Sequence, residues 1–202
     1  MQKKIRKSKS FYIDTNVAVD YATNRDIQTV LLLERIKEKN WKCVSSTFLA
    51  MEMADYQQVY TFITKEISKK RNPEDILRSR GNKNLNASDF QETEEWFADF
   101  NKRFKNLTLY DFITDSNGWA LARDISFNSN LSAPDLIHLT SAMLGSISGD
   151  CDILMTKDGQ LRKEAEKILL RHNEIKLAVM NVPEVKKKFF SENVDPTKTR
   201  SR

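Results

Sequence analysis

The feature that most constrains the fold is the alternation of short apolar segments with longer amphipathic ones. Short apolar segments are typical of strands at residues 11–13, 42–45, 107–110, 151–155 and 175–180. Helical spacing of apolar residues occurs between them, at 17–21, 26–39, 48–63, 119–127, 135–144 and 160–170. This alternation predicts a parallel sheet with helices on both faces. We therefore expect an α/β fold, a three-layer α/β/α sandwich around a central parallel five-stranded sheet.

The helix that follows the second strand has Ser46 or Thr47 as its expected cap. It should carry a set of apolar side chains inward. That set comprises Phe48, Met51, Val59, Phe62 and Ile63.

The middle of the chain adds a helical elaboration to this plan, at about residues 61–104. Residues 65–83 are mostly basic, whereas residues 89–99 carry only acidic charges. Ser88 and Gln91 resemble a capping box at the start of a helix. One face of that helix is apolar, and we assign it to the core, with a dimer or partner surface as the alternative. The members of this face are Phe90, Phe97, Phe100 and Phe104.

The length of 202 residues fits one domain with a substantial core. We expect this domain over residues 11–182, with a basic N-terminal tail at 1–10. A second basic tail should occupy residues 183–202 and be frayed from Lys186.

The apolar runs and the two cysteines favour a cytoplasmic protein. The first apolar run is too short for a signal peptide, and none approaches the roughly 18 residues of a membrane span. We therefore expect a cytoplasmic protein with no membrane partner. Cys43 and Cys151 lie in apolar segments, which favours two buried, reduced thiols over a disulfide.

The net charge of +5 favours, but does not establish, a polyanionic partner. Basic surface attracts nucleic acid, and an acidic pocket on such a protein would need cations before a phosphate could enter.

Four acids fall where the strands and helices of a parallel sheet would gather them. Asp14 and Asp158 follow two predicted strands, whereas Glu52 and Asp135 lie in the first turns of two helices. In open parallel sheets, ligands bind beyond the carboxyl ends of the strands. Each acid also has a plainer reading, as a helix cap, a turn residue or a solvated helix residue.

Clustered carboxylates repel one another, and divalent cations relieve that repulsion. Mg²⁺ or Mn²⁺ prefers oxygen ligands and keeps several waters, one of which can attack a phosphate. The four acids therefore indicate a metal-dependent hydrolytic site.

Four motifs around these acids resemble the PIN domain, which is the nuclease fold of many bacterial toxin–antitoxin toxins and of several RNA-processing enzymes. The resemblance covers residues 11 to about 182. The matching segments are Tyr-Ile-Asp14-Thr-Asn16, Ser46-Thr-Phe-Leu-Ala-Met-Glu52, Ala133-Pro-Asp135-Leu-Ile-His138-Leu and Leu154-Met-Thr156-Lys-Asp158. The segment 61–104 is longer than in compact toxins of the family.

The resemblance implies roles for further residues. It implies that the four acids bind Mg²⁺ or Mn²⁺, and that Asn16 and Thr156 orient Asp14 and Asp158 through hydrogen bonds. His138 lies one turn beyond Asp135, where we expect a packing role, with a phosphate contact as the alternative. The implied partners are RNA and an antitoxin protein, whereas a homodimer is the alternative that the apolar face with Phe90, Phe97, Phe100 and Phe104 offers.

These observations predict a metal-dependent endoribonuclease, with Lys69, Lys70 and Arg71 contacting the RNA backbone. One alternative is a DNA or structure-specific nuclease with the same acids. Another is a non-catalytic RNA-binding or regulatory PIN domain, against which the presence of all four acids argues. A phosphatase with Asp14 as nucleophile would need a second Asp at the position of Asn16.

Overall fold

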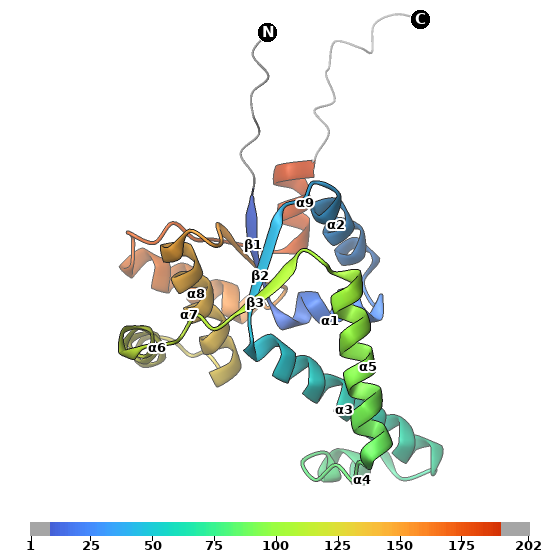
Figure 1. Ribbon diagram of the computed structural model, residues 1–202. Coiled ribbons are helices and arrows are strands. Elements are labelled where there is room, and N and C mark those ends of the chain that lie inside the picture. Colours follow the sequence, from blue (N-terminus) through green and yellow to red (C-terminus); the bar gives the residue numbers. More distant parts are fainter. Residues whose placement is uncertain (1–8, 191–202) are drawn as a thin grey trace, which may run out of the picture.

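The computed structural model describes residues 9–190, which form a parallel sheet flanked by helices (Figure 1). Five strands make up the sheet, in the order β3-β2-β1-β4-β5, and every neighbouring pair is parallel. Their bounds are β1 Ser10–Ile13, β2 Lys42–Ser46, β3 Leu107–Tyr110, β4 Ile153–Met155 and β5 Ala178–Met180. The predicted three-layer α/β/α fold is thus confirmed.

The strand order reverses between β1 and β4, because later strands are added on opposite sides of this pair. From β1 the strands run outward through β2 to β3 on one side, and from β4 to β5 on the other. Tyr12 pairs with Leu154 at this junction, and Asp14 and Thr156 directly follow the two strands. Such a switch point leaves a crevice beyond the strand ends, where ligands of open α/β sheets bind.

Helices cover both faces, and successive residues of β1 point into different cores. Phe11 and Ile13 pack in one core with α1, α2, α3, α5 and α9, whereas Tyr12 packs in the other with α6, α7 and α8. The first group comprises α1 Thr15–Thr23, α2 Ile27–Glu38, α3 Phe48–Ser68, α5 Ala87–Arg103 and α9 Val182–Phe190. The second group comprises α6 Ser116–Asn128, α7 Ala133–Ser148 and α8 Gly159–Arg171.

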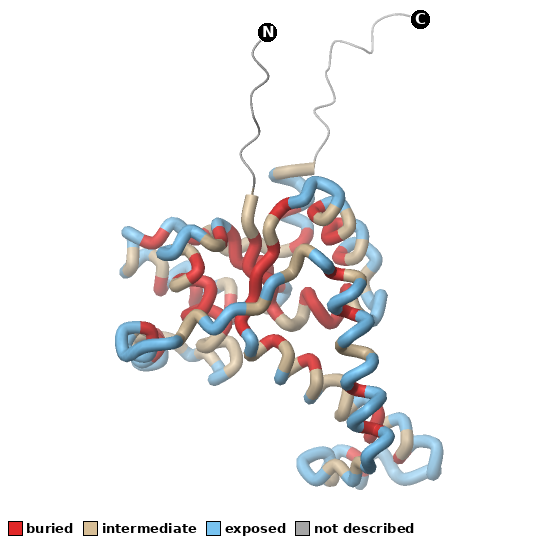
Figure 2. The backbone as a smooth tube through the Cα atoms, viewed as in Figure 1, coloured by how far each residue is buried: buried red, intermediate tan, exposed pale blue. Residues whose placement is uncertain are grey.

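The predicted elaboration is an arm formed by the outer part of α3, by α4 (Pro73–Ser79) and by α5. In Figure 1, α3 and α5 run side by side away from the sheet, and α4 lies at their far end. The far end is largely exposed (Figure 2). Ion pairs join its parts, since Lys65 binds Asp89 across the two long helices and Lys83 binds Asp55.

Local details of the two long arm helices differ from the predictions. The cap of α5 is Asn86, which forms a reciprocal capping box with Asp89, so the prediction of Ser88 with Gln91 was two residues late. Phe90 is 48% exposed, although Phe100 and Phe104 are buried as predicted. Met51 is 66% exposed and Met53 is buried instead.

The start of α3 also differs from its prediction. Thr47 occupies the cap position, but its hydroxyl makes no capping bond and donates instead to Asp111.

The C-terminal tail begins later than the sequence suggested. Val182 and Val185 are buried in the core, and Phe190 packs against Trp41 with the ring centroids 5.3 Å apart. Because these contacts anchor α9, Lys186 lies on a helix rather than in a frayed tail. The expected N-terminal tail at 1–8 and the remainder of the C-terminal one at 191–202 lie outside the described residues.

Cys43 and Cys151 are free and buried, as predicted. Burial raises the pKa of the Cys151 thiol to about 12, so this thiol stays protonated near neutral pH. Over residues 9–190, no helix is both long and apolar enough to cross a membrane.

Candidate active site

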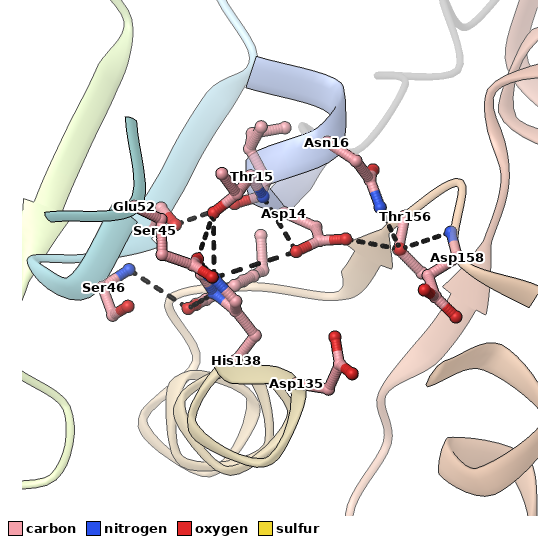
Figure 3. A network of polar contacts seen from close by, with 12 residues as sticks. Asp14, Thr15, Asn16, Ser45, Ser46, Glu52, Asp135, His138, Thr156 and Asp158 are labelled. Atoms are coloured by element: carbon pink, nitrogen blue, oxygen red, sulfur yellow. Dashed lines mark hydrogen bonds and ion pairs between the residues drawn. The ribbon is translucent and has the colours of Figure 1, made fainter. Parts of the chain in front are cut away.

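Asp14 is held at the carboxyl end of β1 and is only 4% exposed. One carboxylate oxygen caps α1 by accepting from the Thr15 amide at 2.8 Å. The other accepts from Thr156 Oγ1 at 2.5 Å (Figure 3). Burial raises the pKa of Asp14, even though His138 and these hydrogen bonds lower it.

Thr156 links the ends of β1 and β4. Its hydroxyl donates to Asp14 and accepts from Asn16 Nδ2 at 3.3 Å and from the Asp158 amide at 3.0 Å. Asn16 also accepts from the Lys157 amide at 3.1 Å, so it ties α1 to the loop after β4. Thr156 therefore orients Asp14 directly, and Asn16 acts through Thr156.

His138 joins the two layers of helices at the site. Its Nε2 lies 2.5 Å from Glu52 Oε2, and its Nδ1 lies 2.9 Å from Tyr12 Oη. Tyr12 Oη accepts from the Ser46 amide at 3.2 Å. Because the pKa of His138 is raised to about 10, both ring nitrogens carry protons near neutral pH, and Nε2 donates to Glu52 while Nδ1 donates to Tyr12 Oη.

His138 is 1% exposed and packs edge-to-face against Phe48, which fits the predicted packing role. Its polar contacts were not predicted. Burial lowers the pKa of His138, but Tyr12, Glu52 and Asp14 outweigh burial, and the net pKa is raised.

Glu52 projects from α3 and is bound from two sides. Besides His138, it accepts from Thr15 Oγ1 at 2.5 Å. Burial raises the pKa of Glu52, but the bond from His138 outweighs it, so the pKa is lowered and the carboxylate form is favoured. Glu52 therefore presents a negative charge whose position is fixed by the first turn of α1 and by α7.

Asp135 lies in the first turn of α7, as expected, and Asp158 follows β4, as expected, where it is the N-cap of α8. Asp135 Oδ2 accepts from Ser132 Oγ at 2.6 Å in the first turn of α7. Asp158 caps α8 by accepting from the Leu161 amide at 2.7 Å, and Thr156 lies between it and Asp14 (Figure 3).

A pocket of about 290 Å³ opens at this place. Three of the four predicted acids line it together, namely Asp14, Glu52 and Asp135. Asp158 is not among the lining residues. Among residues 9–190, no three His, Cys, Asp or Glu side chains are grouped as a ready-made metal cage.

Arg25 lines the same pocket and was not singled out from the sequence. Its guanidinium binds Asp20 at 2.6 Å, and the almost fully buried Asp20 also binds Lys157 Nζ at 2.5 Å. Asp20 therefore holds one cation at the rim of an otherwise acidic pocket. The sequence carried no sign of this, because the three residues meet only when α1 turns back beside the loop after β4.

No family model matches the chain, and no curated protein matches it. Among solved structures, the chain is similar to the crystal structure of VapBC2 from Rickettsia felis bound to a DNA fragment from their promoter. The identity is 13%, the TM-score is 0.48, and the match covers 85% of this chain and 98% of that chain. A likeness at this level carries no inference about activity, and the fold assignment rests on the strand order and pairing.

The basic run predicted to contact RNA is partly occupied by contacts within the arm. Lys69 and Arg71 both bind the buried Glu66, at 2.7 and 2.5 Å. Lys70 lies between them at the end of α3 with a positive φ of 57° and is exposed. Of the three predicted contacts, Lys70 is thus the one without an ion pair in the described part of the chain.

Proposed function

We propose that this chain is a metal-dependent nuclease that hydrolyses phosphodiester bonds in RNA, with Mg²⁺ or Mn²⁺ as cofactor. The observation that carries the proposal is that Asp14, Glu52 and Asp135 line one pocket at the switch point of the parallel sheet. These residues lie far apart in the sequence, and ordinary solvated carboxylates have no reason to converge on one crevice.

The donor set fits a hard divalent cation. Asp14 is buried, its pKa is raised by that burial, and no Lys or Arg of the described residues pairs with it, so a bound cation would satisfy its charge. Mg²⁺ is usually bound through one or two carboxylates and keeps several waters, so the site needs no cage of three protein ligands. Asp14 and Asp135 would hold it, with Glu52 contributing charge.

When bound, the cation would activate water and stabilise the leaving oxygen. The chain's own residues would orient the carboxylates and the substrate for this chemistry. Thr156 and the Thr15 amide fix both oxygens of Asp14, and His138 fixes Glu52. Arg25, held by Asp20, presents a guanidinium that can bind the substrate phosphate at the rim.

Cleavage of a labelled single-stranded RNA tests the proposal. The purified chain should cleave it with Mg²⁺ or Mn²⁺ and lose this activity in EDTA, and it should prefer RNA over matched single-stranded DNA and branched duplex. Full activity after exhaustive chelation would remove the metal from the mechanism. A preference for DNA would leave the site in place but change the substrate.

The four motifs around Asp14, Glu52, Asp135 and Asp158, in the order typical of PIN-domain toxins, also support a proposal about biological role. We propose that the chain is a toxin whose partner is an antitoxin protein. Expression of the chain should then arrest growth, and co-expression of the product of the adjacent gene should relieve the arrest. Growth arrest by wild type and by an inactive pocket variant alike would contradict this role.

A further inference from the structure

A second pocket lies beside the acidic pocket and differs from it in character. It measures about 160 Å³, and aromatic side chains supply much of its wall. Its lining includes Ser46, Phe48, Tyr110, Asp111, Phe112 and Trp119. We call it the aromatic pocket.

The two pockets share a wall. The rings of Phe48 and His138 are 5.7 Å apart, and Phe48 lines the aromatic pocket whereas His138 lines the acidic one. Phe48 and Glu52 are also one turn apart on α3, so they lie on the same face of that helix. A ligand bound at the acidic pocket therefore has the aromatic pocket as its immediate neighbour.

The aromatic pocket has unused binding capacity. Trp119 is 60% exposed and Tyr110 is 37% exposed, although both are large rings that gain from being covered. Ser46 is 4% exposed, and its Oγ has no hydrogen-bond partner in the described structure. Buried hydroxyls normally have a partner, so Ser46 marks a position that a polar ligand edge could complete.

We propose that the aromatic pocket binds an unpaired nucleobase adjacent to the scissile phosphate. This inference rests on the proposed nuclease function and adds a base subsite to it. A cavity of about 150 Å³ accommodates one benzene ring, so the volume suits a single planar base. Trp119 would stack on the base face, and hydroxyls such as that of Ser46 would bond to its edge.

An apolar side chain of a partner protein is the competing occupant, and the polar groups argue against it. Such a side chain would cover Trp119 but leave Ser46 Oγ without a partner. The carboxylate of Asp111 also lines this pocket, and a carboxylate accepts hydrogen bonds from the amino groups of bases. A base would both stack on the rings and form hydrogen bonds with the polar groups.

Binding of short oligonucleotides in EDTA, where no cleavage can occur, tests the subsite. Trp119→Ala should weaken binding of single-stranded RNA about fivefold or more, the range found for loss of one stacked base. Trp119→Phe keeps a stacking ring and should retain most of the affinity. Phe127→Ala is the matched control, because Phe127 is an 81% exposed aromatic on the same helix that does not line the pocket.

Tryptophan fluorescence supplies an independent readout. Single-stranded RNA should quench the emission of wild type, and Trp119→Phe should lose most of the quench. A matched oligodeoxyribonucleotide distinguishes the source of the base, since equal quenching by both would assign the pocket to bases of either nucleic acid. An RNA with an abasic residue at the bound position should bind like the Trp119→Ala variant.

Unchanged RNA affinity of folded Trp119→Ala would overturn the inference, as would equal binding of intact and abasic RNA. Melting curves confirm folding, which the exposure of Trp119 favours. Failure of cleavage in the acidic-pocket assays would leave these binding results standing, so the two proposals fail separately.

Discussion

Replacing Asp14 with Asn separates a metal ligand from a helix cap, because the two roles predict different outcomes. Asn removes the charge and one anionic oxygen, so loss of the ligand should raise the barrier by several kcal/mol. Since each ~1.4 kcal/mol is a tenfold loss in rate, cleavage should fall about a hundredfold or more. Single-turnover cleavage of RNA measures this.

The stability of Asp14→Asn should change little without metal. One hydrogen bond worth about 1 kcal/mol is weakened, but a buried charge is also removed. The melting temperature should therefore stay within about 4 °C of wild type, and Mg²⁺ should stabilise wild type only. Asp115→Asn is the control, since Asp115 caps α6 away from the acidic pocket and its loss should leave cleavage intact. Near-wild-type cleavage by Asp14→Asn would exclude Asp14 as a metal ligand.

At the scale of single residues, the sequence predicted the positions of side chains that directly follow a strand. Asp14 follows a strand and therefore falls at the sheet edge, and the bond between Thr156 and Asp14 follows from two adjacent parallel strands. The contact of His138 with Glu52 joins residues 86 apart and depends on how α3 and α7 pack, which no local pattern specifies. The carboxylate of Asp158 was assigned to the metal site, and its observed bond is to the backbone of α8.

Among the elements, the start of α2 is fastened to the loop after β4 by a charged contact. Lys157 Nζ binds Asp26 Oδ2 at 2.9 Å, and this bond, together with those from the Thr29 hydroxyl and the Gln28 amide, lowers the pKa of Asp26 from 3.8 to about 2. A lowered pKa of an acid in the folded state adds stability above the unfolded pKa, and that stability is lost as the pH falls through about 2.

Asp26→Asn should therefore destabilise the protein by ~1 kcal/mol near neutral pH, after allowance for solvent screening of this partly exposed pair. Asn retains the capping bond to the Gln28 amide, so the helix itself should persist. Urea denaturation at decreasing pH measures the difference from wild type, which should shrink as the pH falls below about 4 and approach zero below about pH 2. A difference that is constant with pH would mean that the charge of Asp26 is not involved.

The tip of the arm depends on Glu66. This residue is 6% exposed and binds both Lys69 and Arg71 where α3 ends. Glu66→Ala leaves two neighbouring cations without their partner, so the turn after α3 should open locally while the sheet stays protected. Limited trypsin digestion should then cut faster at Lys69 to Arg71, and hydrogen exchange should increase there alone.

Glu74→Ala is the matched control for the arm, because Glu74 is exposed and its contact with Arg78 spans 3.9 Å. Equal trypsin sensitivity of the two variants would show that Glu66 does not hold the tip.

Element boundaries were predictable where apolar periodicity ends sharply, as for β3, whose bounds match the prediction. They failed where two patterns compete. Asn86 with Asp89 and Ser88 with Gln91 both satisfy the spacing of a capping box, and in the structure Asp89 of the first pair also binds Lys65 on α3. Met51 and Met53 were likewise indistinguishable until the direction of α3 was fixed.

At the scale of the whole molecule, the arm and the acidic pocket are far apart. From Glu52 to its end at Ser68, α3 extends over about 16 residues, which is ~24 Å at ~1.5 Å per residue, and Lys70 follows just beyond that end. A stacked single strand covers this distance in about seven nucleotides at ~3.4 Å each. Basic side chains at the arm tip can therefore help only with substrates of at least that length.

Lys70→Gln with Arg80→Gln should thus weaken binding of long RNA and reduce its salt slope by about one per lost phosphate contact. Oligonucleotides of about three residues should bind as they do to wild type. Lys163→Gln with Lys176→Gln removes the same charge elsewhere, from exposed positions outside the arm. If this control lowers affinity for long RNA equally, the effect is one of net charge, and the arm makes no specific contact.

The layered architecture and the parallel sheet were predictable because alternating strands and helices allow few other arrangements. The order of the strands was not predicted. It depends on β4 returning to pair with β1 rather than with β3, and residues 142 positions apart form that pair, such as Ile13 and Met155 at its end. Local sequence carries no information about such a choice.

The pairing of β1 with β4 also has a consequence during synthesis. Ribosomes add about 5–20 residues per second, so β1 waits roughly 7–28 seconds before β4 has been translated. Long-range parallel pairing is also slow in itself. The nascent chain therefore carries Asp14 without Thr156, and the crevice is assembled only after β4 has emerged from the ribosome. A hydrolase built in this way would be harmless to the messenger that encodes it until β4 has been translated.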